Sequence, residues 1–80
     1  MTTLREARLH ALLSMRQLAR KAGMSPTTIY LLESGQRSPQ LLTIYKLSRA
    51  LGIAPEEIEE FRRAMKRESV GEPSHEENRS

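Results

Sequence analysis

The stretch Ser14–Gly35, SMRQLARKAGMSPTTIYLLESG, contains the start and stop signals of two short helices. Ser14 and Gln17 have the spacing of a capping box, in which each side chain accepts a hydrogen bond from the other residue's backbone N–H. A helix therefore begins at Met15. Gly23 can adopt the left-handed conformation that ends a helix without a Cβ penalty. The sequence thus predicts a first helix of about two turns, ending just before this glycine.

A second helix follows after a turn of only a few residues. Ser25 suits the N-cap, and Pro26 suits the first helical position, where no backbone donor is needed. The helix runs to about Glu33. Two helices joined by so short a turn must cross steeply, and Ala19 supplies the small side chain that a close crossing needs. Four other apolar side chains are expected to face the interior: Leu18, Ala22, Ile29 and Leu32.

These residues resemble the DNA-binding helix-turn-helix of the lambda-repressor and Cro-like, or XRE-type, family. That family has Ala, Gly and Ile or Val at the spacing of Ala19, Gly23 and Ile29. The resemblance extends from about Leu4 to Ile58. It implies an all-α fold, a compact five-helix lambda-repressor-like DNA-binding domain with the helix-turn-helix at about residues 15–34, in a domain spanning residues 1–68.

Length and composition restrict the other possibilities. Eighty residues make one small domain, with little room for a catalytic cleft beside its core. The chain has no cysteine and only two isolated histidines, and it contains no nucleophile–base pair or Gly-rich phosphate loop. It also contains no apolar run of about 18 residues. We therefore expect no enzymatic activity, cofactor, metal, membrane span or small-molecule effector site, and a cytoplasmic location.

Charge is distributed unevenly along the chain. Residues 1–54 hold eight Lys or Arg against two Glu, a net charge of +6, whereas residues 55–80 hold five against eight, a net charge of −3. A basic body with an acidic end suits a polyanionic partner. Charge alone is equally consistent with a polyanionic partner and with an ordinary solvated surface. The interpretation as a polyanion-binding surface therefore depends on the helix-turn-helix in the same part of the chain.

Two further helices are expected on either side of the central pair. Thr3 and Glu6 form another capping box, which predicts a helix over about residues 4–12. Its Leu9 and Leu12, with the following Leu13, are expected to pack under the next helix or against the carboxy-terminal one. The helix at 40–51 is predicted to bury Leu41, Ile44, Leu47 and Leu51, and to end at Gly52. Leu42 lies on its outer face and is a candidate for a subunit contact.

A fifth helix is predicted to start at Pro55 and to run to about residue 68. Phe61 and Met65 lie on its apolar stripe, and part of their stripe is expected to have nothing in the same subunit to cover it. They therefore form the predicted interface of a homodimer. The alternative is a monomer in which this helix folds back across Leu9 and Leu12. Residues 69–80 are polar and charged, and are predicted to be a disordered tail.

The resemblance implies that the helix at about 26–33 enters the major groove of double-stranded DNA. Its outer residues are then the base-reading candidates: Pro26, Thr27, Thr28, Tyr30 and Leu31. Leu31 offers no bidentate donor, and apolar contact with thymine methyl groups is its expected substitute. The phosphate-contacting candidates flank this helix, and they are Met15, Arg16, Gln17, Arg20, Gln36, Arg37 and Ser38. Met15 stands where the family usually has Gln.

The same resemblance implies a structural ion pair between Arg8 and Glu33. The whole pattern indicates a sequence-specific transcriptional regulator, most readily a repressor, that binds double-stranded DNA as a homodimer. The alternative is a protein-interaction adaptor or an antitoxin-like partner protein that keeps the fold and binds another protein instead. Basic residues at Arg16, Arg20, Lys21 and Arg37 favour DNA. The adaptor is favoured by the absence of strong hydrogen-bonding side chains at Met15, Pro26 and Leu31.

Overall fold

The computed structural model describes residues 2–67, and helices joined by short loops make up most of this part of the chain. Its elements are α1 (Leu4–His10), α2 (Met15–Ala22), α3 (Pro26–Glu33), α4 (Leu41–Leu51), the 3-10 helix η1 (Pro55–Glu57) and a last helix over residues 59–67. The predicted all-α, five-helix fold is therefore confirmed. The predicted tail at 69–80 lies outside the described residues. None of the helices within the described part is both long and apolar enough to cross a membrane.

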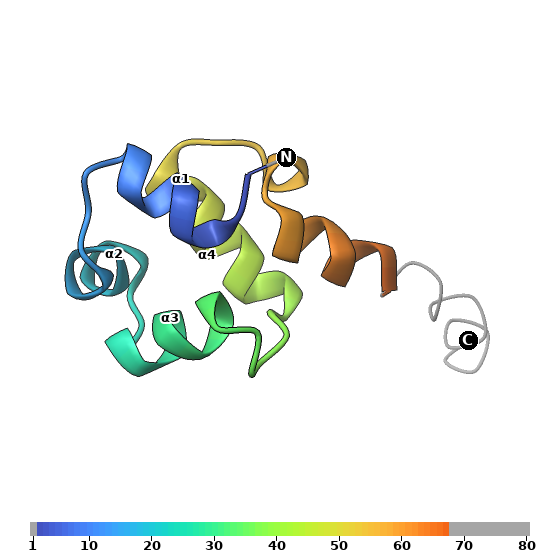
Figure 1. Ribbon diagram of the computed structural model, residues 1–80, viewed down its shortest axis with the longest axis horizontal. Helices are drawn as coiled ribbons and strands as arrows, with labels where there is room; N and C mark the ends of the chain where they lie inside the picture. Colours follow the sequence, from blue (N-terminus) through green and yellow to red (C-terminus); the bar gives the residue numbers. More distant parts are fainter. Residues whose placement is uncertain (1, 68–80) are drawn as a thin grey trace.

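The helices pack around one apolar core. Figure 1 shows α2 and α3 at one end of the body, α4 running through its middle and the last helix at the other end. Seven side chains are almost completely buried in this core: Leu4, Leu18, Ile29, Leu32, Leu47, Ile58 and Phe61. Burial of each stabilises the fold by about 1.5–3 kcal/mol. Ala19 is also buried, which permits the close approach of α2 and α3 that the sequence predicted.

The end of α1 differs from the prediction. The helix stops at His10 rather than near Leu12, because Leu12 adopts a left-handed conformation with φ of 60°. The N–H of Leu12 donates to the Leu9 carbonyl, and the N–H of Leu13 donates to the Arg8 carbonyl. These two bonds form a Schellman motif, in which glycine is the usual left-handed residue. The predicted packing of Leu9 and Leu12 is wrong, since both are exposed, while Leu13 is half-buried against the core.

Helix α4 also buries fewer residues than predicted. Ile44 and Leu47 are buried as expected, and Leu51 is half-buried against the core. Leu41, predicted to be in the core, is instead exposed. It is the first residue of the helix, directly after the loop that follows α3. Gly52 ends the helix in the left-handed conformation, as predicted.

The carboxy-terminal helix does not begin at Pro55. Residues 55–57 form η1, and Ile58 is extended and bridges Thr2. The Glu59 N–H donates to the Thr2 carbonyl over 2.7 Å, and the Thr2 N–H donates to the Glu57 carbonyl over 3.2 Å. These bonds hold the chain extended at residue 58, so the α-helix starts only at residue 59. The amino terminus and the start of the last helix consequently lie side by side (Figure 1).

This attachment overturns the premise of the predicted dimer interface. Phe61 is fully buried in the core of its own subunit, and Met65 is half-buried against the same core. The carboxylate of Glu60 accepts a hydrogen bond of 2.8 Å from the Leu4 N–H, at the start of α1. The last helix therefore packs beside the amino terminus and covers neither Leu9 nor Leu12. The prediction that Phe61 is left uncovered is therefore wrong. The alternative, in which the last helix folds back across Leu9 and Leu12, is wrong as well.

Candidate nucleic-acid interface

The amino-terminal end of α2 is organised by the predicted capping box. The hydroxyl of Ser14 accepts from the Gln17 N–H over 3.0 Å, and Gln17 Oε1 accepts from the Ser14 N–H over 2.8 Å. The first N–H groups of an α-helix have no acceptor within the helix, and the helix dipole makes this end partly positive. Met15 and Arg16 thus contribute backbone donors that suit an anion such as a phosphate.

A shallow cavity of about 280 Å³ lies between this helix end, α1 and α3. Its walls are formed by Arg5, Arg8, Met15, Tyr30, Glu33 and Ser34. The Met15 side chain is half-buried against the core, so it provides an apolar wall and no hydrogen bond to a ligand. Arg5 and Tyr30 are exposed at the rim. Arg5 was not predicted, although its spacing of three from Arg8 puts both on one face of α1.

Helix α3 presents a ridge of side chains to solvent. Ser25 caps it as predicted, since its hydroxyl accepts from the Thr28 N–H over 3.3 Å and lies 3.1 Å from Thr28 Oγ1. Thr27 and Tyr30 are exposed on the outer side, together with Pro26, and Leu31 is partly exposed. Ile29 and Leu32 anchor the opposite side in the core. The predicted base-reading residues therefore share one accessible surface, with Thr28 at its edge.

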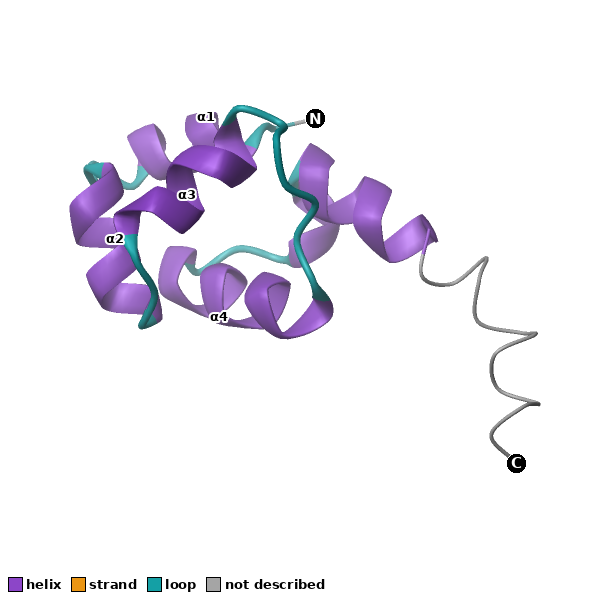
Figure 2. Ribbon diagram, turned by 90° about the horizontal axis from the view of Figure 1, so that it is seen from below, coloured by secondary structure: helices purple, strands orange, loops and turns teal. Residues whose placement is uncertain are grey.

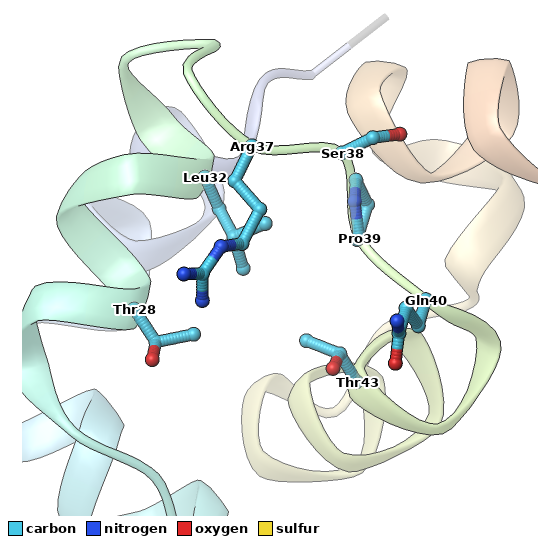
Figure 3. A pocket seen from close by; sticks show the side chains of 7 residues that line it. All are labelled: Thr28, Leu32, Arg37, Ser38, Pro39, Gln40 and Thr43. Carbon is cyan, nitrogen blue, oxygen red and sulfur yellow. The ribbon is translucent and has the colours of Figure 1, made fainter.

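A second cavity, of about 240 Å³, separates α3 from the beginning of α4. Figure 3 shows the Arg37 side chain extending toward Thr28, with Gln40 and Thr43 on the far wall. Arg37 and Gln40 are exposed and place a cation and an amide beside the ridge of α3. Gln40 and Thr43 were not among the predicted site residues, because the sequence pattern marks them only as the beginning of a helix. Their position across the cavity from Thr28 depends on how α2 packs against both α3 and α4.

The other loop residues have partners within the protein. Gln36 Nε2 donates to the Ser34 hydroxyl over 3.0 Å, and that hydroxyl donates to the Leu31 carbonyl over 3.2 Å. The Ser38 hydroxyl accepts from Arg67 Nη1 over 3.0 Å and points away from the cavity toward the last helix (Figure 3). Gln36 and Ser38 therefore shape the loop, whereas Arg37 extends from it.

The expected ion pair between Arg8 and Glu33 is present. Arg8 Nε donates to Glu33 Oε2 over 2.6 Å, Nη2 donates to Oε1 over 3.0 Å, and Nη1 donates to the Leu13 carbonyl over 3.1 Å. The hydrogen bond to Glu33 raises the pKa of Arg8, so the guanidinium stays charged. The bidentate pair ties α1 to the last turn of α3 and thereby helps to fix the orientation of the exposed ridge.

The charge around α3 is of one sign. Glu6 and Glu33 are the only acidic residues between positions 1 and 54. Glu6 accepts from the Thr3 N–H in the capping box of α1, and Glu33 is paired with Arg8. Five exposed cations surround α2, α3 and the following loop: Arg5, Arg16, Arg20, Lys21 and Arg37. This surface can therefore attract a polyanion without a competing carboxylate.

Comparison with known proteins agrees with this geometry. A family model described as helix-turn-helix matches residues 4–58, which is more than half of the chain. An HTH-type transcriptional regulator of Methanothermobacter thermautotrophicus, itself described as uncharacterized, is 39% identical over 51 residues, covering 64% of this chain and 74% of that protein. No solved structure matches the chain significantly. The extent of the family match, together with the paired helices α2 and α3, shows that the chain belongs to this helix-turn-helix family.

Proposed function

We propose that this protein is a sequence-specific transcriptional regulator that binds double-stranded DNA with α3 in the major groove. The observation that carries the proposal is the exposed ridge of α3, which has cations on both flanks and no free carboxylate beside it. The name of its relative as a transcriptional regulator supports the same function.

In this proposal the ridge reads bases and its flanks bind phosphates. Thr27 supplies a hydroxyl and a methyl group to base edges, while Leu31 and Pro26 supply apolar contact with thymine methyl groups. Arg37 and Gln40 contact phosphates on one side of α3. On the other side, phosphate contacts come from Arg16, Arg20, Arg5 and the first backbone N–H groups of α2.

We further propose that the protein represses transcription by occupying its site, and that two copies bind neighbouring half-sites. A single helix of eight residues reads few base pairs, and affinities typical of regulators are reached more readily with two half-sites about one helical turn apart. Phe61 has no role in joining the copies in this proposal, because it is buried within its own subunit.

Selection of bound fragments from random duplex DNA tests the central proposal. Arg37→Ala should weaken binding about equally on all sequences and reduce the slope of log K against log salt by roughly one. Thr27→Ala should instead change the preferred sequence. Arg62→Ala removes an equal charge from the exposed side of the last helix and serves as the control. An altered base preference in Arg37→Ala, with an unchanged slope, would reverse the assigned roles.

A second candidate function is a protein-interaction adaptor. The observation in its favour is the lack of polar side-chain donors at Met15, Pro26 and Leu31, three of the positions where the proposal places DNA. An adaptor would enrich no duplex sequence in the selection, even at low salt. Such a result would reject the regulator and leave the adaptor.

A further inference from the structure

The outer face of α4 carries apolar and basic side chains with no acidic residue among them. Leu41, Leu42, Tyr45, Lys46 and Arg49 recur at helical spacing on the side opposite the buried Ile44 and Leu47. The three apolar side chains are 53%, 62% and 57% exposed. Single exposed apolar residues are ordinary, but three adjacent ones bordered by charges are typical of an interaction surface.

The basic residues extend this face toward α2. A shallow hollow of about 360 Å³ lies between the two helices, with Ala22 and Ala50 in its walls and Lys21, Lys46 and Arg49 around it. Arg49 is held against Tyr45, with Nη1 3.3 Å from the phenol oxygen and the guanidinium carbon 5.6 Å from the ring centroid. This contact places one cation beside the apolar residues. The face is therefore an apolar strip with a positive border.

No other element of the described chain covers this face. Figure 2 shows α4 along one edge of the body, with α1 at the opposite edge. The last helix directs Phe61 into the core and is fastened to the amino terminus through Glu60. Leu41, Leu42 and Tyr45 thus form a surface that is accessible to solvent in the folded subunit.

We propose that the outer face of α4 docks an acidic amphipathic segment of another protein, with its apolar residues on Leu41, Leu42 and Tyr45 and its carboxylates toward Lys46, Arg49 and Lys21. The positive charge of the face favours an acidic partner over a neutral or basic one. A second copy would bring like-charged borders together. The helix, with 11 residues, is also only about 17 Å long, which is short for the roughly 800 Å² that each partner of a stable dimer buries. The inference goes beyond DNA binding and does not depend on it.

Titration with two synthetic peptides tests the proposal. Both peptides have leucines at helical spacing over about four turns, and the positions between the leucines are Glu in one peptide and Lys in the other. Amide chemical shifts of the full chain report the binding. The Glu peptide should bind at least about tenfold more tightly than the Lys peptide, with the largest shifts in residues 41–50. Equal binding of the two, or no saturable binding of either, would overturn the proposal.

Two substitutions locate the contact. Leu42→Ser should weaken binding of the Glu peptide about tenfold, whereas Leu9→Ser, which shortens an exposed leucine on α1, should leave it unchanged. Both positions are exposed, so the fold should be kept, and circular dichroism checks that it is. Equal losses from the two variants would show that the peptide binds exposed leucines without preference, contrary to the proposal.

Three further measurements test the role of charge and the two other possible ligands of this face, a second copy of the chain and duplex DNA. The double variant Lys46→Glu, Arg49→Glu should prefer the Lys peptide over the Glu peptide. If sedimentation instead shows a wild-type dimer that Leu42→Ser dissolves, the face belongs to a second copy and the proposal fails. It also fails if duplex DNA displaces the Glu peptide and the charge reversal weakens DNA binding as much as Arg37→Ala does, because the cations would then be phosphate contacts.

Discussion

The side chains of Arg8 and Glu33 are only 8% and 5% exposed, so each charge depends on the other. Glu33→Ala leaves the guanidinium of Arg8 buried without its carboxylate, and should lower the free energy of unfolding by about 3 kcal/mol. Denaturant unfolding measures the loss. Glu59→Ala is the matched control, because it breaks the exposed pair with Arg63 and should cost no more than about 0.5 kcal/mol. Similar midpoints for the two variants would contradict the burial of the pair.

Leu12 is a second residue whose effect can be predicted from its surroundings. It is 88% exposed and holds a left-handed conformation that disfavours any side chain with a Cβ atom. Leu12→Gly relieves this strain and loses almost no packing. The gain exceeds the extra entropy of glycine in the unfolded chain, and we expect about 0.5–1 kcal/mol of added stability. Ala11→Gly, one residue earlier at a φ of −85°, should destabilise the protein in the same thermal melt.

At the scale of one element, α4 begins without the cap that α1, α2 and α3 have. Gln40 occupies the N-cap with extended backbone, yet its side chain makes no capping hydrogen bond. Gln40→Ser supplies a hydroxyl acceptor and should stabilise the domain by about 0.5–1 kcal/mol. If Gln40 contacts DNA as proposed, the same variant should bind its selected duplex more weakly. A more stable variant with unchanged DNA affinity would remove Gln40 from the interface.

At the scale of the whole molecule, the last helix belongs to the core. Phe61 is fully buried in the same core cluster as Leu4 and Ile58, so Phe61→Ala should create a cavity and cost about 3–5 kcal/mol. That is a large part of the total stability of a small domain. Met65→Ala, at a half-buried position, should cost clearly less. Calorimetry should show one cooperative transition, and a separate early transition for the last helix would contradict its place in the core.

The sequence alone was sufficient for features that depend on neighbouring residues. The capping boxes, Pro26 at the start of α3 and the left-handed Gly23 and Gly52 all lie within a turn or two of the helix ends that they define. Amphipathic spacing likewise predicted the buried Leu18, Ile29 and Leu32. The long-range pair of Arg8 with Glu33 came from family resemblance, since no local rule connects residues so far apart in the chain.

Only the tertiary structure decided which residues come together in space and which apolar residues are covered. The bridge between Thr2 and Ile58 fixes where the last helix starts and turns Phe61 inward, which the helical pattern of residues 55–68 does not reveal. The packing of α4 against α2 places Gln40 and Thr43 across a cavity from Thr28 and leaves Leu41 exposed. The sequence shows which residues are apolar, and helical periodicity shows which of them share one face of a helix. Whether that face is covered depends on distant parts of the chain, and so on the way the helices pack together.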